Sequence, residues 1–137
     1  MWIFFALLSA FFAALTTILA KIGLEDINSN LAVAIRTIIV LIMAWAIVFF
    51  TGKHNDIAAI GQKNLIFLIL SGAAAGLSWL FYYRALQIGE ASKVIPIDKL
   101  SIVLGMIMAF IILKETITLK TIIGGILITI GTFVLIF

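Results

Sequence analysis

The segment Leu31–Phe50, LAVAIRTIIVLIMAWAIVFF, decides the fold of this chain. It is 20 residues long and carries a single charged side chain, Arg36. An α-helix rises about 1.5 Å per residue, so about 20 such residues cross the roughly 30 Å hydrocarbon layer of a bilayer. The 12 Ile, Leu, Val and Phe residues of the segment outweigh the insertion cost of the arginine. The segment is therefore predicted to be a membrane-spanning helix.

Four further apolar runs flank this segment, and together the five fill almost the whole chain. We expect spans at about 2–20, 31–50, 65–83, 91–113 and 121–137 of one domain that covers residues 1–137. Hydrophobic residues make up 65% of the chain, and the mean hydropathy is +1.35. The breaks between the runs are short and polar, so we expect no soluble domain. The predicted fold class is an all-α integral membrane protein with five transmembrane helices.

The polar residues exclude several classes of function. The chain has no cysteine and a lone His54, so it offers no thiolate or imidazole cluster for a metal. It also lacks a Gly-rich phosphate loop and a nucleophile–base pair. The net charge of +3 is spread over loops and helix ends, which favours anchoring at lipid headgroups over nucleic-acid binding. The sequence therefore predicts a non-enzymatic protein of the lipid bilayer with no metal, cofactor or nucleic-acid partner.

An odd number of spans places the two termini on opposite sides of the membrane. A second copy joined head to tail would be inverted relative to the first, which is the repeat plan of many secondary transporters. Loops on the N-terminal side carry four Lys and Arg residues, and loops on the opposite side carry three. The positive-inside rule needs a clear asymmetry to set an orientation. The near balance is what a protein with dual topology, inserted in both orientations, would show, and a partner chain or misplaced span ends would give the same balance.

The fourth predicted span contains the single acidic side chain that is embedded in an apolar run. Its central sequence, from Lys93 to Ser101, is KVIPIDKLS. Pro96 lacks a backbone donor and clashes with the preceding turn, so the helix is predicted to kink or loosen there. Broken helices at membrane depth need protein or a water-filled cavity to satisfy the freed backbone groups. The candidate substrate-binding or gating residues of this span are Pro96, Asp98, Lys99 and Ser101, with a purely structural ion pair as the alternative.

Arg36 and Asp98 both lie a few residues from the same end of their predicted spans. Their matched depth, and the cost of an unpaired charge in lipid, predict that these two side chains form an ion pair. The alternative for Arg36 is that its long side chain reaches the headgroups. Asp98 and Lys99 are adjacent and are not expected to face each other on a helix. Lys99 is therefore predicted to point to the headgroups or into a cavity.

Two aromatic residues approach one end of the third predicted span. Trp79 and Tyr82 belong either to an aromatic belt at the membrane interface or to the wall of a substrate cavity. Flat rings with polar tips suit organic solutes, so both residues are candidates for substrate binding.

Two pairs of glycines indicate close helix contacts. Gly72 and Gly76 are four residues apart in the third span, and Gly124 and Gly131 are seven apart in the last. Each pair lies on one helix face, where the missing side chains let another helix approach closely. The contact is predicted to lie either within one chain or at a dimer seam.

The run YYRALQIGEAS, from Tyr82 to Ser92, and the run PIDKLS, from Pro96 to Ser101, resemble the EamA-like families of the drug/metabolite transporter superfamily. The glycines of the last span add to this resemblance, which covers the whole chain and is closest to single-domain, five-span prokaryotic members. The resemblance implies one half of an inverted-repeat transporter in a prokaryotic inner membrane. It also implies export or exchange of small metabolites by alternating access.

Four-span relatives in the same superfamily use a glutamate in their first helix for proton-coupled drug antiport. Residues 1–20 of this chain contain no glutamate, so that mechanism is not carried over, and a salt-bridge gate at Asp98 is predicted instead. The predicted function is a secondary transporter of small organic metabolites that works as an antiparallel homodimer. The alternative is a half-subunit of a lipid-linked-sugar flippase, or of another membrane complex, with a different partner chain.

Overall fold

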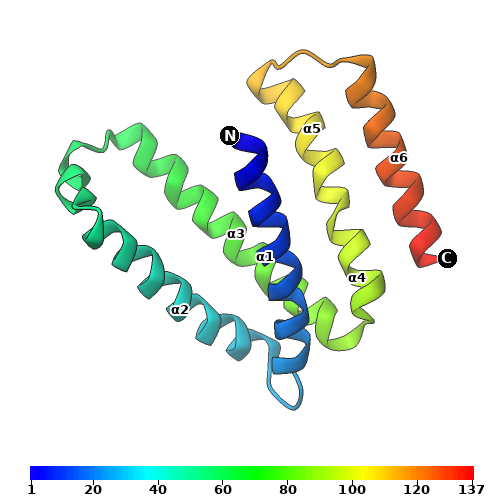
Figure 1. Cartoon of the computed structure of the whole chain (residues 1–137), viewed down its shortest axis with the longest axis horizontal. Coiled ribbons are helices and arrows are strands. Elements are labelled where there is room, and N and C mark those ends of the chain that lie inside the picture. The colour runs from blue at the N-terminus through cyan, green and yellow to red at the C-terminus, as the bar shows by residue number, and fades with distance from the viewer. The chain divides into compact units, whose positions relative to one another are not determined.

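The computed structural model describes all residues from Met1 to Phe137, and every regular element is helical (Figure 1). The elements in chain order are α1 (Trp2–Gly23), α2 (Ser29–Phe50), the 3-10 helix η1 (Lys53–Ala59), α3 (Gln62–Ile88), α4 (Ala91–Asp98), α5 (Leu100–Leu113) and α6 (Leu119–Ile136). Five segments are long and apolar enough to cross a membrane, and α4 and α5 together form the fourth. The predicted all-α membrane fold with five spans is confirmed.

The helices extend beyond several of the predicted span ends. α1 ends at Gly23 rather than near residue 20, and α3 runs from Gln62 to Ile88 rather than from 65 to 83. Apolar runs mark only the hydrocarbon layer, whereas the backbone hydrogen bonds of a helix continue into the polar interface. The loop between the second and third spans also contains η1, which the sequence did not predict. It begins after Gly52, whose φ of +69° is a conformation that glycine adopts at little cost.

Side-chain caps set the start of two helices. Asn28 Oδ1 accepts hydrogen bonds from the backbone N–H groups of Asn30 at 2.9 Å and Leu31 at 3.4 Å, at the start of α2. Thr118 Oγ1 accepts one from Thr121 N–H at 3.2 Å, at the start of α6. The first turn of a helix has backbone donors without helical acceptors, and these caps satisfy some of them.

The chain divides into two compact units, and each is described by itself. The central unit is Ile18–Gln87, and the terminal unit combines Met1–Thr17 with Ile88–Phe137. The buried hydrophobic residues all belong to the central unit and are Leu24, Val33, Tyr83 and Leu86. They come from the turn after α1, the first part of α2 and the last part of α3. The core of the central unit therefore lies where these three segments meet.

Two polar contacts reinforce this core. Lys21 Nζ donates a hydrogen bond to the backbone oxygen of Leu86. Gln87 Nε2 donates to the backbone oxygen of Ile27 at 2.7 Å. Both acceptors are carbonyls at the end of a helix or in a turn, where helical donors are missing. The end of α3 is thereby tied to α1 and to the turn that follows it.

In the terminal unit, α6 packs against α4 and α5. Gly125 of α6 is buried, and a Cβ atom at this position would lie 3.3 Å from Met106 Cε of α5. The missing side chain therefore allows α5 and α6 to approach each other closely.

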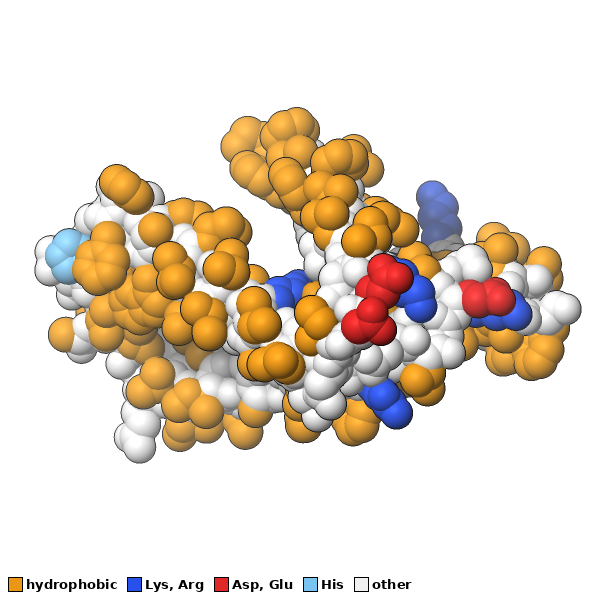
Figure 2. Space-filling model, turned by 90° about the horizontal axis from the view of Figure 1, so that it is seen from below, with side chains coloured by type: hydrophobic (Ala, Val, Ile, Leu, Met, Phe, Trp, Pro, Cys, Tyr) orange, Lys and Arg blue, Asp and Glu red, His pale blue; other side chains and the backbone are white.

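Most large apolar side chains of a single chain are exposed. Phe81 and Val134 are 74% and 73% exposed, and hydrophobic side chains cover most of the face shown in Figure 2. Apolar surfaces of this extent are covered by lipid or by another protein. The exposure is what a membrane protein shows when neither is present.

Candidate functional site

The fourth span is interrupted three residues after Pro96. α4 ends at Asp98, α5 begins at Leu100, and Lys99 joins them. The distortion predicted near the proline is therefore present. The backbone N–H of Ile102 donates to Lys99 O at 3.0 Å, which is the tighter three-residue pattern of a 3-10 turn.

Asp98 and Lys99 form an ion pair at this break. Lys99 Nζ lies 3.2 Å from Asp98 Oδ2, and the side chains are 50% and 34% exposed, respectively. The expectation that these neighbours would not face each other is wrong, because it assumed an uninterrupted helix. Ser101 is exposed in the first turn of α5. The predicted ion pair between Asp98 and Arg36 would join the two units and stays a prediction.

A threonine on α6 supports the broken helix. Thr132 Oγ1 donates a hydrogen bond to Pro96 O at 3.3 Å, and Thr132 is 5% exposed. Within a membrane an unsatisfied backbone group costs several kcal/mol, so such a partner is needed where a helix is interrupted. The sequence predicted that protein or water would satisfy the break, but it gave no signal that singled out Thr132 from the other threonines of α6.

Replacing Thr132 with valine should lower the free energy of unfolding by about 1 kcal/mol, because an interhelical hydrogen bond is lost at nearly constant shape. Thr129→Val is the matched control, since Thr129 Oγ1 donates at 2.9 Å to Gly125 O of its own helix. The Gly125 carbonyl lies inside α6 and also accepts a backbone hydrogen bond of that helix. Loss of the Thr129 hydroxyl should therefore lower the free energy of unfolding by less. Thermal unfolding of both variants in detergent checks this. Equal stabilities would mean that the Thr132–Pro96 bond does not support the break.

Arg36 lies against two aromatic rings of α3. Its guanidinium carbon is 4.4 Å from the centroid of the Trp79 ring and 5.6 Å from that of Tyr83. Both distances are within the range of favourable cation–π contacts. Arg36 is seven residues after Ser29, the first residue of α2, and thus about 10 Å along the helix. The charge of Arg36 therefore lies well inside the second span and packs against aromatic rings of α3.

Tyr83, which was not singled out as a site candidate from the sequence, contacts Arg36. Tyr83 is 4% exposed, whereas Tyr82 is half-buried, with its ring 6.5 Å from that of its neighbour. Trp79 and Tyr83 are four residues apart and share one face of α3. This spacing was the signal in the sequence that could have identified Tyr83.

The predicted glycine pairs make no close helix contact within the chain. A Cβ atom at any of them would find no atom within 4 Å outside the local helix backbone: Gly72, Gly76, Gly124 and Gly131. The close contact lies at Gly125 instead. A role for the predicted pairs at a dimer seam stays a prediction.

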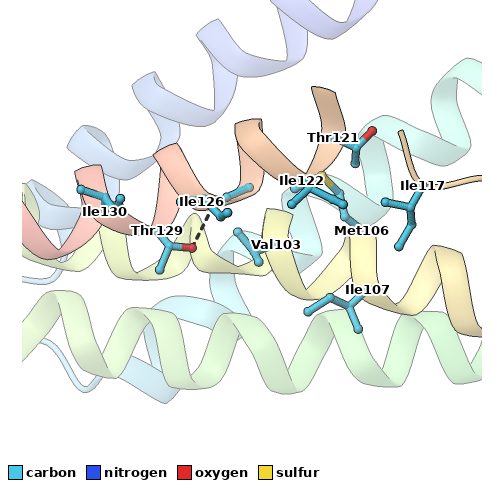
Figure 3. Close-up of a pocket in the computed structure, with 10 residues that line it drawn as sticks. Val103, Met106, Ile107, Ile117, Thr121, Ile122, Ile126, Thr129 and Ile130 are labelled. Atoms are coloured by element: carbon cyan, nitrogen blue, oxygen red, sulfur yellow. Dashed lines mark hydrogen bonds between the residues drawn. The ribbon is translucent and has the colours of Figure 1, made fainter. Parts of the chain in front are cut away.

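An apolar groove of about 320 Å³ lies between α5 and α6 (Figure 3). Its lining residues are Val103, Met106, Ile107, Ile117, Thr121, Ile122, Gly125, Ile126, Thr129 and Ile130. None of the predicted site residues is among them. The Thr129 hydroxyl donates to Gly125 O, as the dashed line in Figure 3 marks, so it is already engaged within α6. The groove therefore offers an apolar surface rather than a polar binding site.

Comparisons with known proteins find similarity along the whole chain. The sequence model of the EamA-like transporter family matches residues 1–137. An uncharacterized transporter in the cobO 3' region of a Sinorhizobium species is 46% identical over 98% of this chain and 95% of its own length. An uncharacterized protein of Methanocaldococcus jannaschii is 32% identical over 97% of this chain and 94% of its own length. No solved structure matches.

A further relative is a longer protein. An uncharacterized transporter of Synechocystis is 31% identical over an alignment of 135 positions that covers 93% of this chain and 37% of that protein. The part of the Synechocystis protein outside the match is therefore longer than the part inside it.

Proposed function

Since the chain belongs to the EamA-like transporter family, we propose that it is a secondary transporter that exports or exchanges small organic metabolites across a prokaryotic inner membrane. The observation that carries this proposal is the interrupted fourth span, with Asp98 and Lys99 at the interruption. Asp98 is the single acidic residue within the five candidate spans. Transporters typically build substrate sites from discontinuous helices, and charged residues inside spans typically mark transport pathways.

In this proposal Asp98 is a gate that changes its ion-pair partner during alternating access. Lys99 is the partner in the state described here, at 3.2 Å. Arg36 is the proposed partner in the other state, because it lies seven residues from the start of α2 just as Asp98 lies seven residues from the start of α4. The carboxylate of Asp98 then keeps a basic partner while the path opens to one side, which avoids an unpaired carboxylate in lipid.

The proposed working unit is an antiparallel homodimer. Alternating access generally uses two inverted repeats that move about a central site, and one chain contains a single set of five spans. The predicted glycine pairs face open space within the chain and are available for a seam. The Synechocystis relative is long enough to hold two such sets in one chain. The near balance of loop charges permits insertion in both orientations.

Cysteine labelling in intact cells tests this assembly, because the chain has no cysteine of its own. Asn55→Cys lies in η1, and Glu25→Cys lies in the exposed turn between α1 and α2, on the opposite side of the membrane. A membrane-impermeant maleimide should label both variants from outside, each in about half of the molecules, if the two orientations occur equally. Complete labelling of one variant and none of the other would show a single orientation and exclude the antiparallel homodimer.

The second candidate is a half-subunit of a lipid-linked-sugar flippase, or of another membrane complex, with a different partner chain. The apolar groove between α5 and α6 favours this candidate, because its lining would accept a prenyl or acyl chain. A single orientation in the labelling experiment, together with co-purification of a different membrane protein, would support it over the homodimer.

A further inference from the structure

Arg36 differs from the other basic side chains around the core of the central unit in what it contacts. Lys21 donates to Leu86 O, and Arg84 Nη1 donates to Gln87 Oε1 at 2.8 Å. Arg36 makes no hydrogen bond in the structure. Its contacts are instead the ring faces described above, with its guanidinium carbon 4.4 Å from the Trp79 centroid.

The central unit contains the carboxylates of Glu25, Asp26 and Asp56, but none of them forms an ion pair with Arg36. The ion pair within that unit joins Lys53 and Asp56 of η1, which lies after the far end of α2. A guanidinium carries five N–H donors and keeps its charge at any physiological pH. An arginine at membrane depth with neither an anion nor an acceptor is costly, and this cost favours the binding of an anion by its free donors.

The ring contacts leave the N–H donors of Arg36 without a hydrogen-bond acceptor. Guanidinium N–H donors lie in the plane of the group and match the two oxygens of a carboxylate or a phosphate. The guanidinium carbon lies 4.4 Å from the centroid of the Trp79 ring, and this contact restricts the arginine side chain, which reduces the side-chain entropy lost when an anion binds. The same arrangement disfavours a cationic substrate, because the aromatic faces already hold a positive charge.

We propose that Arg36 binds the carboxylate or phosphate group of the transported metabolite, so that the substrates are organic anions. The apolar body of the anion would contact the ring of Trp79, which is partly exposed beside the guanidinium, whereas the buried ring of Tyr83 supports Arg36. This inference rests on the proposed transport function and adds the chemical class of the substrate to it.

Four probes that share a phenyl ring and differ in their polar group test the class of substrate. They are benzoate, phenyl phosphate, benzylamine and benzyl alcohol, compared at equal ionic strength. The purified full chain carries Trp2→Phe and Trp45→Phe, so that Trp79 is the remaining tryptophan and its fluorescence reports on the site. Benzoate or phenyl phosphate should raise the unfolding temperature and change the Trp79 emission, and the response to each separates a carboxylate site from a phosphate site. A response to benzylamine or benzyl alcohol, with none to either anion, would overturn the proposal.

Variants then assign the effect to Arg36. Arg36→Gln should weaken anion binding by about tenfold or more, since charge-assisted hydrogen bonds are lost. Arg36→Lys should retain part of the affinity, because it keeps the charge without the planar fork. Arg84→Gln is the matched control and should bind anions as the parent does. Unchanged binding in Arg36→Gln would overturn the proposal. If that variant does not fold, the Trp79 response of the arginine-containing protein decides alone.

Transport assays in proteoliposomes separate this inference from the function on which it rests. Transport of benzylamine that Arg36→Gln leaves intact would overturn the anion site and keep the transporter. Anion binding that depends on Arg36, without movement of any probe across the membrane, would keep the site and contradict the transport function.

Discussion

Asp98→Asn should lower the rate of transport by about tenfold or more, while the amount of protein in the membrane stays the same. Asparagine preserves the shape of the side chain but removes the charge that balances Lys99 at 3.2 Å. Loss of a charge-assisted interaction of about 1.5–3 kcal/mol at a gate corresponds to about tenfold or more in rate. The measurement is efflux from proteoliposomes of a compound that stabilises the purified protein, with the protein content determined in parallel.

Asp56→Asn provides the matched control for this experiment. Asp56 also pairs with a lysine, at 3.6 Å from Lys53 Nζ, but both side chains are exposed in η1 outside the spans. Exposed ion pairs contribute little, so Asp56→Asn should transport at the parent rate. Asp98→Glu should retain part of the activity because it keeps the charge. If Asp98→Asn matches Asp56→Asn in rate, Asp98 has a structural role at most.

Leu86→Ala should lower the free energy of unfolding by about 2–5 kcal/mol, the range measured when buried leucines are truncated. Leu86 is fully buried at the core of the central unit, and its backbone oxygen accepts the hydrogen bond from Lys21. Truncation removes the packing contacts between the end of α3 and its neighbours, and the surroundings can refill the space only partly.

Ile88→Ala is the control for Leu86→Ala. Ile88 lies two residues further along the same helix and is 73% exposed, so its truncation removes few contacts within the chain. Reversible unfolding in mixed micelles should therefore place Leu86→Ala well below Ile88→Ala in stability. Equal losses would mean that the core of the central unit contributes no more to stability than an exposed position at the end of α3.

The features that could be predicted from the sequence are those that depend on local chemistry. The length and apolarity of each run predicted five spans, and the missing N–H of Pro96 predicted the distortion of the fourth. The position of the interruption was less accessible, because the proline weakens the helix but the helix ends only at Asp98. The Asp98–Lys99 contact was missed because the prediction assumed one regular helix through residues 98 and 99.

Contacts between helices depend on how the helices pack, which one sequence does not determine. Arg36 was identified as a candidate, but its contact with Tyr83 depends on the rotation of α3 about its axis. The hydrogen bond from Thr132 to Pro96 joins residues that are 36 positions apart. The close approach at Gly125, rather than at Gly124, likewise depends on which face of α6 meets α5.

The off-centre position of the interruption in the fourth span has a consequence for the distance that a substrate must travel. α4 has 8 residues and α5 has 14, so the joint between them lies about 12 Å from one end of a span that is about 34 Å long. In an antiparallel pair the second joint would lie the same distance from the opposite membrane surface. The two joints would then be separated in depth by about 10 Å. A metabolite that moves from one joint to the other would cross only the middle third of the bilayer. Small tilts of the two α4 helices would then suffice to expose the metabolite on either side.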